Sequence, residues 1–187
     1  MFAHKKKYYL FLESVNLPDL DLIKPRNKYI IIYRNNNLAE NINLVKSFRI
    51  NCKKKSIAFY VANNLKLAIE INADGLYLSS FNKKNINNGK LDLIGSAHNY
   101  TEIKQKIRQG CSNIILSRLF KTNYKHKDDF LGVVKFNLIS KLFNVELIPL
   151  GGIRENNLNK LKIVHSNAIA VLSEIKKKPT KLISRLF

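Results

Sequence analysis

The amino-acid sequence predicts an α/β protein, a compact closed (β/α)8 or TIM barrel in which residues 1–187 form a single domain. Three observations predict this fold. Eight runs rich in apolar, β-branched and aromatic residues recur at fairly even spacing, as strands do. Segments with apolar residues at helical spacing lie between them, which indicates a parallel sheet. Eight such units form a closed barrel more readily than an open sheet.

The predicted strands read as buried on both sides of the sheet. Several of them are apolar without alternation, which is typical of parallel strands covered on both faces. They are YYLFLES (8–14), KYIIIYR (28–34), SIAFYV (56–61), GLYLSS (75–80), LDLIGSA (91–97), NIILSRL (113–119), VELIPLGG (145–152) and AIAVLSEI (168–175).

The predicted helices lie between these strands. In the second of them, Asn99 or Thr101 is a plausible N-cap and Gly110 a C-terminal stop. The segments are LAENINLVKSFRI (38–50), NYTEIKQKIRQG (99–110), FLGVVKFNLISKLF (130–143), RENNLNKLKIV (154–164) and TKLISRLF (180–187).

The first helix is predicted to be reduced or absent. A barrel of this kind typically takes about 250 residues, so the chain of 187 residues is short. The deficit lies between the first two strands, where only VNLPDLDLIKPRN (15–27) is found, and Pro18 and Pro25 interrupt it.

The net charge of +20 raises the question of a nucleic-acid partner. The lysines, however, are scattered along the chain, as at 5–7, 53–55 and 176–178, and an A/T-rich coding sequence explains their abundance. We therefore treat nucleic acid as an unlikely partner. A general positive field still attracts an anionic small substrate.

The expected compartment is the cytoplasm. No run approaches the roughly 18 apolar residues of a membrane span, so no membrane association is expected. Cys52 and Cys111 are the only cysteines, which indicates a reducing compartment with both thiols free. Assembly into a homo-oligomer is left open.

The strongest local signal for a binding site is PLGGIREN (149–156), which follows the seventh predicted strand. Gly151 and Gly152 let backbone N–H groups approach an anion, and Ser173, near the end of the eighth strand, adds a donor. A tight turn that merely needs glycine is the alternative. We favour a phosphate site, which barrels often hold between these two loops.

Two other strand ends carry polar side chains. The loop SRLFKTNYKHKDD (117–129) contains Arg118, Lys121, Thr122 and Lys125. These residues fit two interpretations equally well: a phosphate clamp or mobile lid, and a solvated surface loop. IGSAH (94–98) places Ser96 and His98 at another strand end, where a lone histidine favours a structural role. No Ser–His–Asp set, paired carboxylates or metal-ligand spacing is found in the sequence.

Taken in order, seven segments of the chain resemble the thiamine phosphate synthase family, including its close relative, the thiazole tautomerase. The resemblance extends from about Tyr8 to Ile175, and the Ala-Asp-Gly and Gly-Gly-Ile motifs are its most specific parts. The segments are IIYRNN, VANNLKLA, NADGLYLSSFN, SAHNYTE, SRLFKTNYK, LGGI and AVLSEI.

This resemblance implies a reaction. Such enzymes join hydroxymethylpyrimidine diphosphate to thiazole phosphate, and they release pyrophosphate and thiamine phosphate. Ionisation at the pyrimidine methylene precedes attack by the thiazole nitrogen, and Mg²⁺ stabilises the departing pyrophosphate. The implied partners are therefore small phosphorylated substrates.

The resemblance also implies roles for individual residues. The implied catalytic positions are Arg34, Ser96 and Lys125. The implied substrate- and phosphate-binding positions are Thr122, Gly151, Gly152, Ser173, Arg118 and His98. The implied metal-binding positions are Asn63 and Asn82.

The chain departs from the family pattern where the metal is expected. Asn63 and Asn82 stand where the family has aspartates, and Tyr77 stands where it has histidine. The metal and pyrimidine half of the pattern is therefore eroded, while the thiazole phosphate half is largely kept.

Two interpretations follow. In one, Arg118 and Lys121 supply positive charge and the metal becomes dispensable for synthesis. In the other, the barrel has lost synthase chemistry and binds a phosphorylated small molecule; tautomerase activity has little support, because the loop histidine of that relative falls at Arg118.

Overall fold

The computed structural model confirms the predicted closed barrel. It describes residues 7–16, 20–22, 26–35, 40–86, 91–122 and 129–171. Eight parallel strands are hydrogen-bonded in sequence order, and β8 pairs with β1 to close the sheet. The strands are β1 (Lys7–Leu12), β2 (Tyr29–Tyr33), β3 (Ala58–Ala62), β4 (Gly75–Leu78), β5 (Asp92–Ala97), β6 (Asn113–Ser117), β7 (Glu146–Leu150) and β8 (Ala168–Val171).

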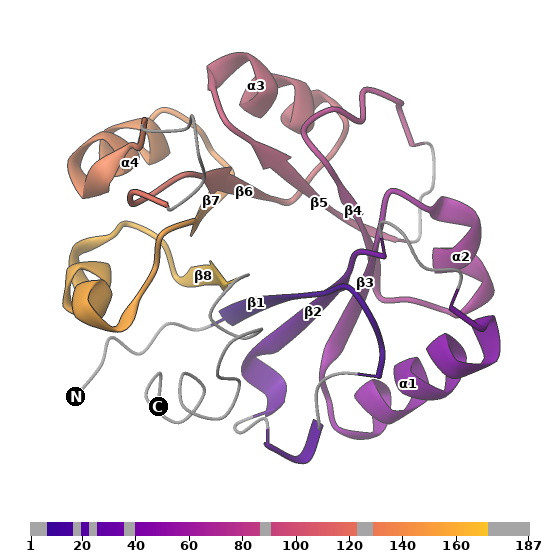
Figure 1. Cartoon of the computed structure of the whole chain (residues 1–187). Coiled ribbons are helices and arrows are strands. Elements are labelled where there is room, and N and C mark those ends of the chain that lie inside the picture. The colour runs from indigo at the N-terminus through magenta and orange to yellow at the C-terminus, as the bar shows by residue number, and fades with distance from the viewer. Residues whose placement is uncertain are drawn as a thin grey trace.

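The helices surround this barrel on the outside (Figure 1). Each α-helix connects two neighbouring strands, as the alternating pattern predicts. They are α1 (Ile42–Lys54), α2 (Leu65–Glu70), α3 (Tyr100–Arg108) and α4 (Gly132–Ser140).

The predicted caps of α3 are found in the structure. The Asn99 side chain accepts a hydrogen bond from the Glu102 N–H, and Gly110 follows the helix with φ of +82°. Because only glycine adopts this angle without strain, the helix ends where the sequence predicts.

Three connections differ from a regular barrel. Between β4 and β5 the described residues form no helix, so the sequence is shortened there as well as between the first two strands. Between β1 and β2 the described residues form only two 3-10 turns, η1 (Leu20–Leu22) and η2 (Arg26–Lys28), in agreement with the predicted reduction of the first helix. Between β7 and β8 the predicted helix is the 3-10 helix η3 (Glu155–Ile163). Its first turn contains two of the asparagines that disfavour a helix interior, and the Asn157 side chain bonds back to the Arg154 N–H.

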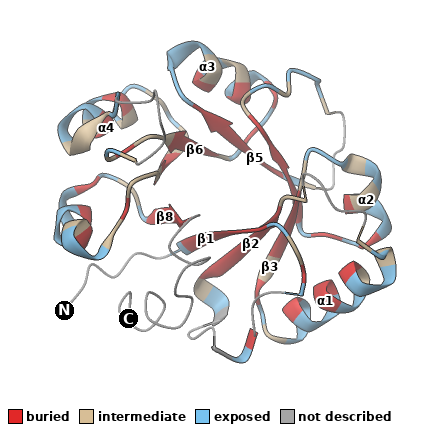
Figure 2. Ribbon diagram, viewed as in Figure 1, coloured by how far each residue is buried: buried red, intermediate tan, exposed pale blue. Residues whose placement is uncertain are grey.

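The barrel has two apolar layers, and Figure 2 shows buried strands inside a ring of helices whose outer faces are exposed. The outer layer packs strands against helices. The inner layer fills the barrel, and large side chains meet small ones there: Tyr9 of β1 is in register with Ala170 of β8. The inner layer consists of Tyr9, Phe11, Ile30, Ile32, Tyr60, Tyr77, Ile94, Ile115, Ile148, Ala168 and Ala170. The barrel is thus a packed core with no open pore.

Within the described ranges, no helix combines the length and the apolar character that crossing a bilayer requires.

The start of β4 has no room for a side chain. A Cβ atom on Gly75 would collide with the Tyr60 ring and lie 2.5 Å from the Asp92 carbonyl oxygen. We expect Gly75→Ala to lower the free energy of unfolding by about 3 kcal/mol, because the interior has to shift around the added carbon. Urea unfolding followed by circular dichroism measures this change.

Gly110→Ala is the matched control for Gly75→Ala. Apart from its chain neighbours, no described residue lies within 4 Å of a Cβ atom on Gly110, so its positive φ is the source of strain. That strain costs about 1 kcal/mol. Equal losses of stability in the two variants would contradict the packing described for β4.

Candidate active site at the barrel mouth

The implied site residues follow the carboxyl ends of different strands. Because all eight strands are parallel in a closed barrel, these ends meet at one mouth. The described residues of this set are Arg34 after β2, Asn63 after β3, Asn82 after β4, Ser96 and His98 at the end of β5, Arg118 and Thr122 after β6, and Gly151 and Gly152 after β7. Lys125 and Ser173 lie outside the described residues.

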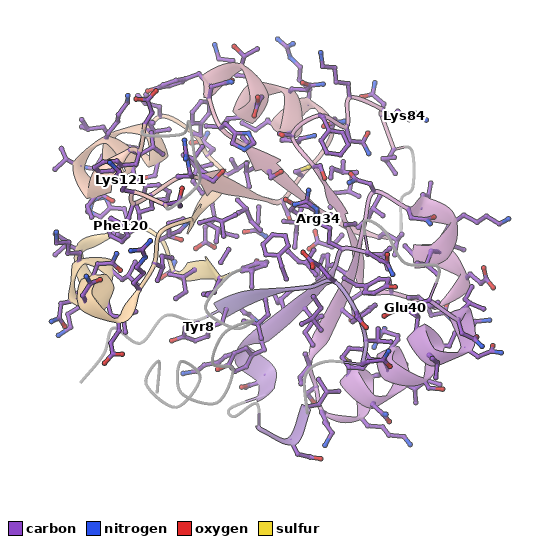
Figure 3. All side chains as sticks on the ribbon, in the orientation of Figure 1. Tyr8, Arg34, Glu40, Lys84, Phe120 and Lys121 are labelled. Carbon is purple, nitrogen blue, oxygen red and sulfur yellow. The ribbon has the colours of Figure 1, made fainter. Side chains whose placement is uncertain are left out.

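Arg34 lies near the middle of the ring of strands (Figure 3). Its backbone N–H donates to the Leu12 carbonyl at 2.7 Å, which ties the end of β2 to the end of β1. The side chain is half-buried, and among the described residues its buried Nε has no hydrogen-bond partner. A buried guanidinium N–H without an acceptor is costly, so this donor is suited to an anion that enters the mouth.

Tyr77 and Ser96 lie beside Arg34 at the inner end of the mouth. Burial raises the pKa of the Tyr77 hydroxyl, while a hydrogen bond with Ser96 and the Arg34 charge act in the opposite direction. The Tyr77 ring packs edge-on to Phe11, with centroids 5.4 Å apart. From the sequence, Tyr77 is only a departure from the family pattern; its inward position on β4 is the signal that places it in the site.

The turns after β3 and β4 are joined by side-chain amides. We call Asn63, Ser79 and Asn82 the amide turn. Asn63 Oδ1 accepts from the Ser79 N–H at 2.9 Å and from Asn82 Nδ2 at 3.2 Å, and Asn63 Nδ2 donates to Ser79 Oγ at 2.6 Å. Asn82 Oδ1 accepts from the Lys84 N–H at 3.1 Å. The structure therefore brings together the two asparagines that the sequence singles out.

The loops after β6 and β7 pack closely on each other. A Cβ atom on Gly152 would collide with the Phe120 carbonyl oxygen and lie 2.6 Å from that of Lys121, so this position requires glycine for packing. The N–H groups of Gly152 and Ile153 donate to no other group in the described part of the chain. Both explanations considered for the glycines, a tight turn and an anion-binding backbone, thus have structural support.

Arg118 and Thr122 belong to this same region. The Arg118 side chain lies against Gly151, and its Nη1 donates to Thr122 Oγ1 at 3.1 Å. Phe120 and Lys121 lie between Arg118 and Thr122 in the sequence, and Figure 3 shows them on the side of the barrel opposite Glu40, which lies just before α1 in the sequence. The contact between Arg118 and Thr122 holds the first part of the β6 loop over the β7 turn.

His98 is exposed and interacts with the first turn of α3. The backbone N–H of His98 donates to Glu102 Oε2 at 2.7 Å, and the ring Nδ1 lies 3.0 Å from the same oxygen. Burial raises the pKa of the Glu102 carboxyl, but the hydrogen bonds from His98 outweigh it and lower the pKa overall. These contacts suit the structural role that sequence analysis favoured; a role in substrate binding stays a prediction.

Comparison with known proteins identifies the family. The family profile described as thiamine monophosphate synthase matches residues 20–175. The chain belongs to this family. A thiamine-phosphate synthase of Prochlorococcus marinus is 31% identical over 131 residues, which are 66% of this chain and 37% of that protein. The chain thus spans little more than a third of that relative.

Other members of the thiamine monophosphate synthase family match a larger share of their own length. A thiamine-phosphate synthase of Clostridium tetani is 25% identical over 170 residues, 88% of this chain and 78% of that protein. Among solved structures, the thiamine phosphate pyrophosphorylase of Pyrococcus furiosus superposes with a TM-score of 0.70 at 17% identity, with 98% of each chain covered. At this identity the superposition supports the barrel fold alone.

The resemblance to this family implies Mg²⁺, yet the donor set of the amide turn does not fit it. Mg²⁺ in proteins is bound through carboxylates and phosphate oxygens. The amide turn has no carboxylate, and both of its amide oxygens accept hydrogen bonds from backbone N–H groups. These backbone donors also fix which end of each amide is oxygen. Among the described residues, no three His, Cys, Asp or Glu side chains form a metal-binding cluster.

Restoring the carboxylates is expected to restore metal binding. In the natural chain, Asn82 Nδ2 donates to Asn63 Oδ1 at 3.2 Å. In the double variant Asn63→Asp/Asn82→Asp, two carboxylates face each other at this place, and their negative charges repel each other unless a cation binds between them. We expect millimolar Mg²⁺ to raise the melting temperature of this variant and not that of the natural chain, as measured by thermal unfolding. NaCl at equal ionic strength is the control. An equal Mg²⁺-dependent rise in the natural chain would contradict the donor assignment.

Proposed function

We propose that this chain is a divergent thiamine phosphate synthase that condenses hydroxymethylpyrimidine diphosphate with thiazole phosphate. The C–O bond between the pyrimidine methylene and the diphosphate breaks, pyrophosphate leaves with the electron pair, and the thiazole nitrogen forms the new C–N bond. Family membership supports this reaction class. The observation that carries the proposal is the buried Nε of Arg34 at the mouth, which no acceptor in the described part of the chain reaches.

Arg34 has the properties that a diphosphate-binding residue requires. Guanidinium donors form charge-assisted hydrogen bonds with phosphate oxygens, and half-burial strengthens them by reducing competition from water. The bond from its backbone N–H to the Leu12 carbonyl fixes the Arg34 backbone at the mouth before substrate arrives. A donor fixed in this way stabilises the charge that develops on departing pyrophosphate without rearranging.

A second anion site is proposed at the β7 turn. The unused N–H groups of Gly152 and Ile153 are suited to the phosphate of the thiazole substrate, because backbone N–H groups at such turns bind anions. Arg118, Lys125, Thr122 and Ser173 would complete the two phosphate sites.

Tyr77 and Ser96 are proposed to lie beneath the reacting groups. Both are buried, and their mutual hydrogen bond orients them next to Arg34. Their part in the reaction is to shape the bottom of the mouth and to keep water from it. Positioning of this kind suffices when the substrate ionises by itself.

A phosphate-binding barrel without synthase activity is the second candidate. The amide turn favours it, since the carboxylates that the family pattern has at these two positions are missing. The two candidates differ in one measurement. Both bind thiazole phosphate, but only the synthase forms thiamine phosphate when both substrates are present.

Replacement of Arg34 tests the leading proposal. We expect Arg34→Met to lower kcat/KM for thiamine phosphate formation by about 100-fold, because a fixed charged donor to the leaving group is lost. Product is measured by chromatography after oxidation to its fluorescent thiochrome.

Arg108→Met is the matched control for Arg34→Met. Arg108 is an exposed residue in the last turn of α3, and its loss removes the same charge away from the mouth. If both variants lost activity equally, Arg34 would act only through net charge. If the natural chain formed no product, the non-catalytic candidate would replace the proposal.

A further inference from the structure

Lys106 is a fully buried lysine on α3 that the proposed reaction does not use. Its side chain is 0% exposed, although Lys104 on the same helix is exposed. The Nζ atom donates to the Asn82 carbonyl oxygen at 2.7 Å and to Gln109 Oε1 at 2.9 Å. Lysine is almost never fully buried unless it is paired, yet Lys106 forms no ion pair with another described residue. Burial lowers the pKa of the Lys106 ammonium, although from an ordinary value far above neutrality, and the bond to the Asn82 carbonyl holds Nζ directly behind the amide turn.

The structure provides a dedicated space for this side chain. A Cβ atom on Gly95 of β5 would lie 2.7 Å from Lys106 Cγ, so the lysine stem crosses β5 only because position 95 is glycine. Gln109 reinforces the contact, since its Nε2 donates to the carbonyl oxygens of Asn82 at 3.1 Å and Lys84 at 2.7 Å. Lys106 of α3 and Gln109, the residue directly after this helix, thus hold the backbone of the β4 loop.

The groups that the amide turn offers to a ligand are chiefly donors. Asn63 Oδ1 accepts two hydrogen bonds and Asn82 Oδ1 one, while the contacts among the described residues use one proton on each of Asn63 Nδ2 and Asn82 Nδ2. Each amide nitrogen carries two protons, so one on each side chain stays available. Asn63 is exposed and Asn82 half-buried, so a ligand can reach both. Such a turn is complementary to an anion.

We propose that Lys106 is a built-in cation of the amide turn, which binds the diphosphate directly and without a divalent metal ion. This inference rests on the proposed function, because it concerns the same diphosphate. The ammonium takes the place of the metal charge behind the turn, and the amide N–H groups contact the phosphate oxygens in front of it. Lys106 is a positioning residue, since its buried Nζ does not touch the ligand.

The effect of Lys106 is large enough to measure. Water and salt screen a fully buried charge far less than an exposed one, so its attraction for an anion on the turn persists in buffer. We expect Lys106→Met to weaken pyrophosphate binding by about tenfold. The methionine fills the space of the lysine stem, and Gln109 still donates to the Asn82 carbonyl oxygen.

The test is calorimetric titration of the full chain with inorganic pyrophosphate, once in EDTA and once in Mg²⁺. We expect the natural chain to bind in EDTA and to bind no more tightly in Mg²⁺. Lys104→Met removes the same charge from the exposed side of α3 and is expected to change the affinity by less than about twofold. Gln109→Met removes hydrogen bonds to the β4 loop but keeps the Lys106 charge. We therefore expect it to weaken pyrophosphate binding less than Lys106→Met does.

Three results would overturn the role of Lys106. They are pyrophosphate binding that requires Mg²⁺, equal affinities of Lys106→Met and Lys104→Met, and a loss in Gln109→Met as large as that in Lys106→Met. If Lys106→Met does not fold, the titrations of the natural chain with and without Mg²⁺ still decide. Thiamine phosphate formation by the natural chain, measured separately, shows whether the proposed function stands when this inference fails.

Discussion

The pairing of β8 with β1 is the constraint on which the rest of the structure depends. Four residues of β8 align with four of β1, from Lys7 with Ala168 to Leu10 with Val171, and this register closes the sheet. Closure of a parallel sheet brings the carboxyl ends of all strands to one mouth. Arg34 and the Gly152 turn, far apart in the sequence, meet there for this reason alone. An open sheet of the same strands would separate them.

The fold was predictable because its signals are local. Each strand is a short apolar run, and the α3 caps are single residues, Asn99 and Gly110, whose conformations follow from their own chemistry. The type of helix before β8 was less predictable, because it depends on a side-chain bond from Asn157 to the Arg154 N–H. A periodic pattern of apolar residues does not encode such a competition between side chain and backbone.

The candidate site was predictable in its positions and less so in its chemistry. Asn63 and Asn82 were expected together, but the hydrogen bond that Asn63 Oδ1 accepts from the Ser79 backbone N–H joins residues sixteen positions apart, which no local pattern reveals. Lys106 was hidden within a helix of alternating charged and apolar residues. Only its contact across Gly95, eleven positions earlier, shows that it points inward.

The central claim is that the mouth binds a diphosphate between Arg34 and the amide turn with no metal ion. The most direct measurement is a crystal structure of the chain grown with pyrophosphate in metal-free buffer. The account predicts diphosphate density in contact with the Arg34 guanidinium and the Asn63 and Asn82 amide nitrogens, while Lys106 stays buried behind them. A pyrophosphate bound elsewhere, or bound only when a cation lies between Asn63 and Asn82, would contradict it.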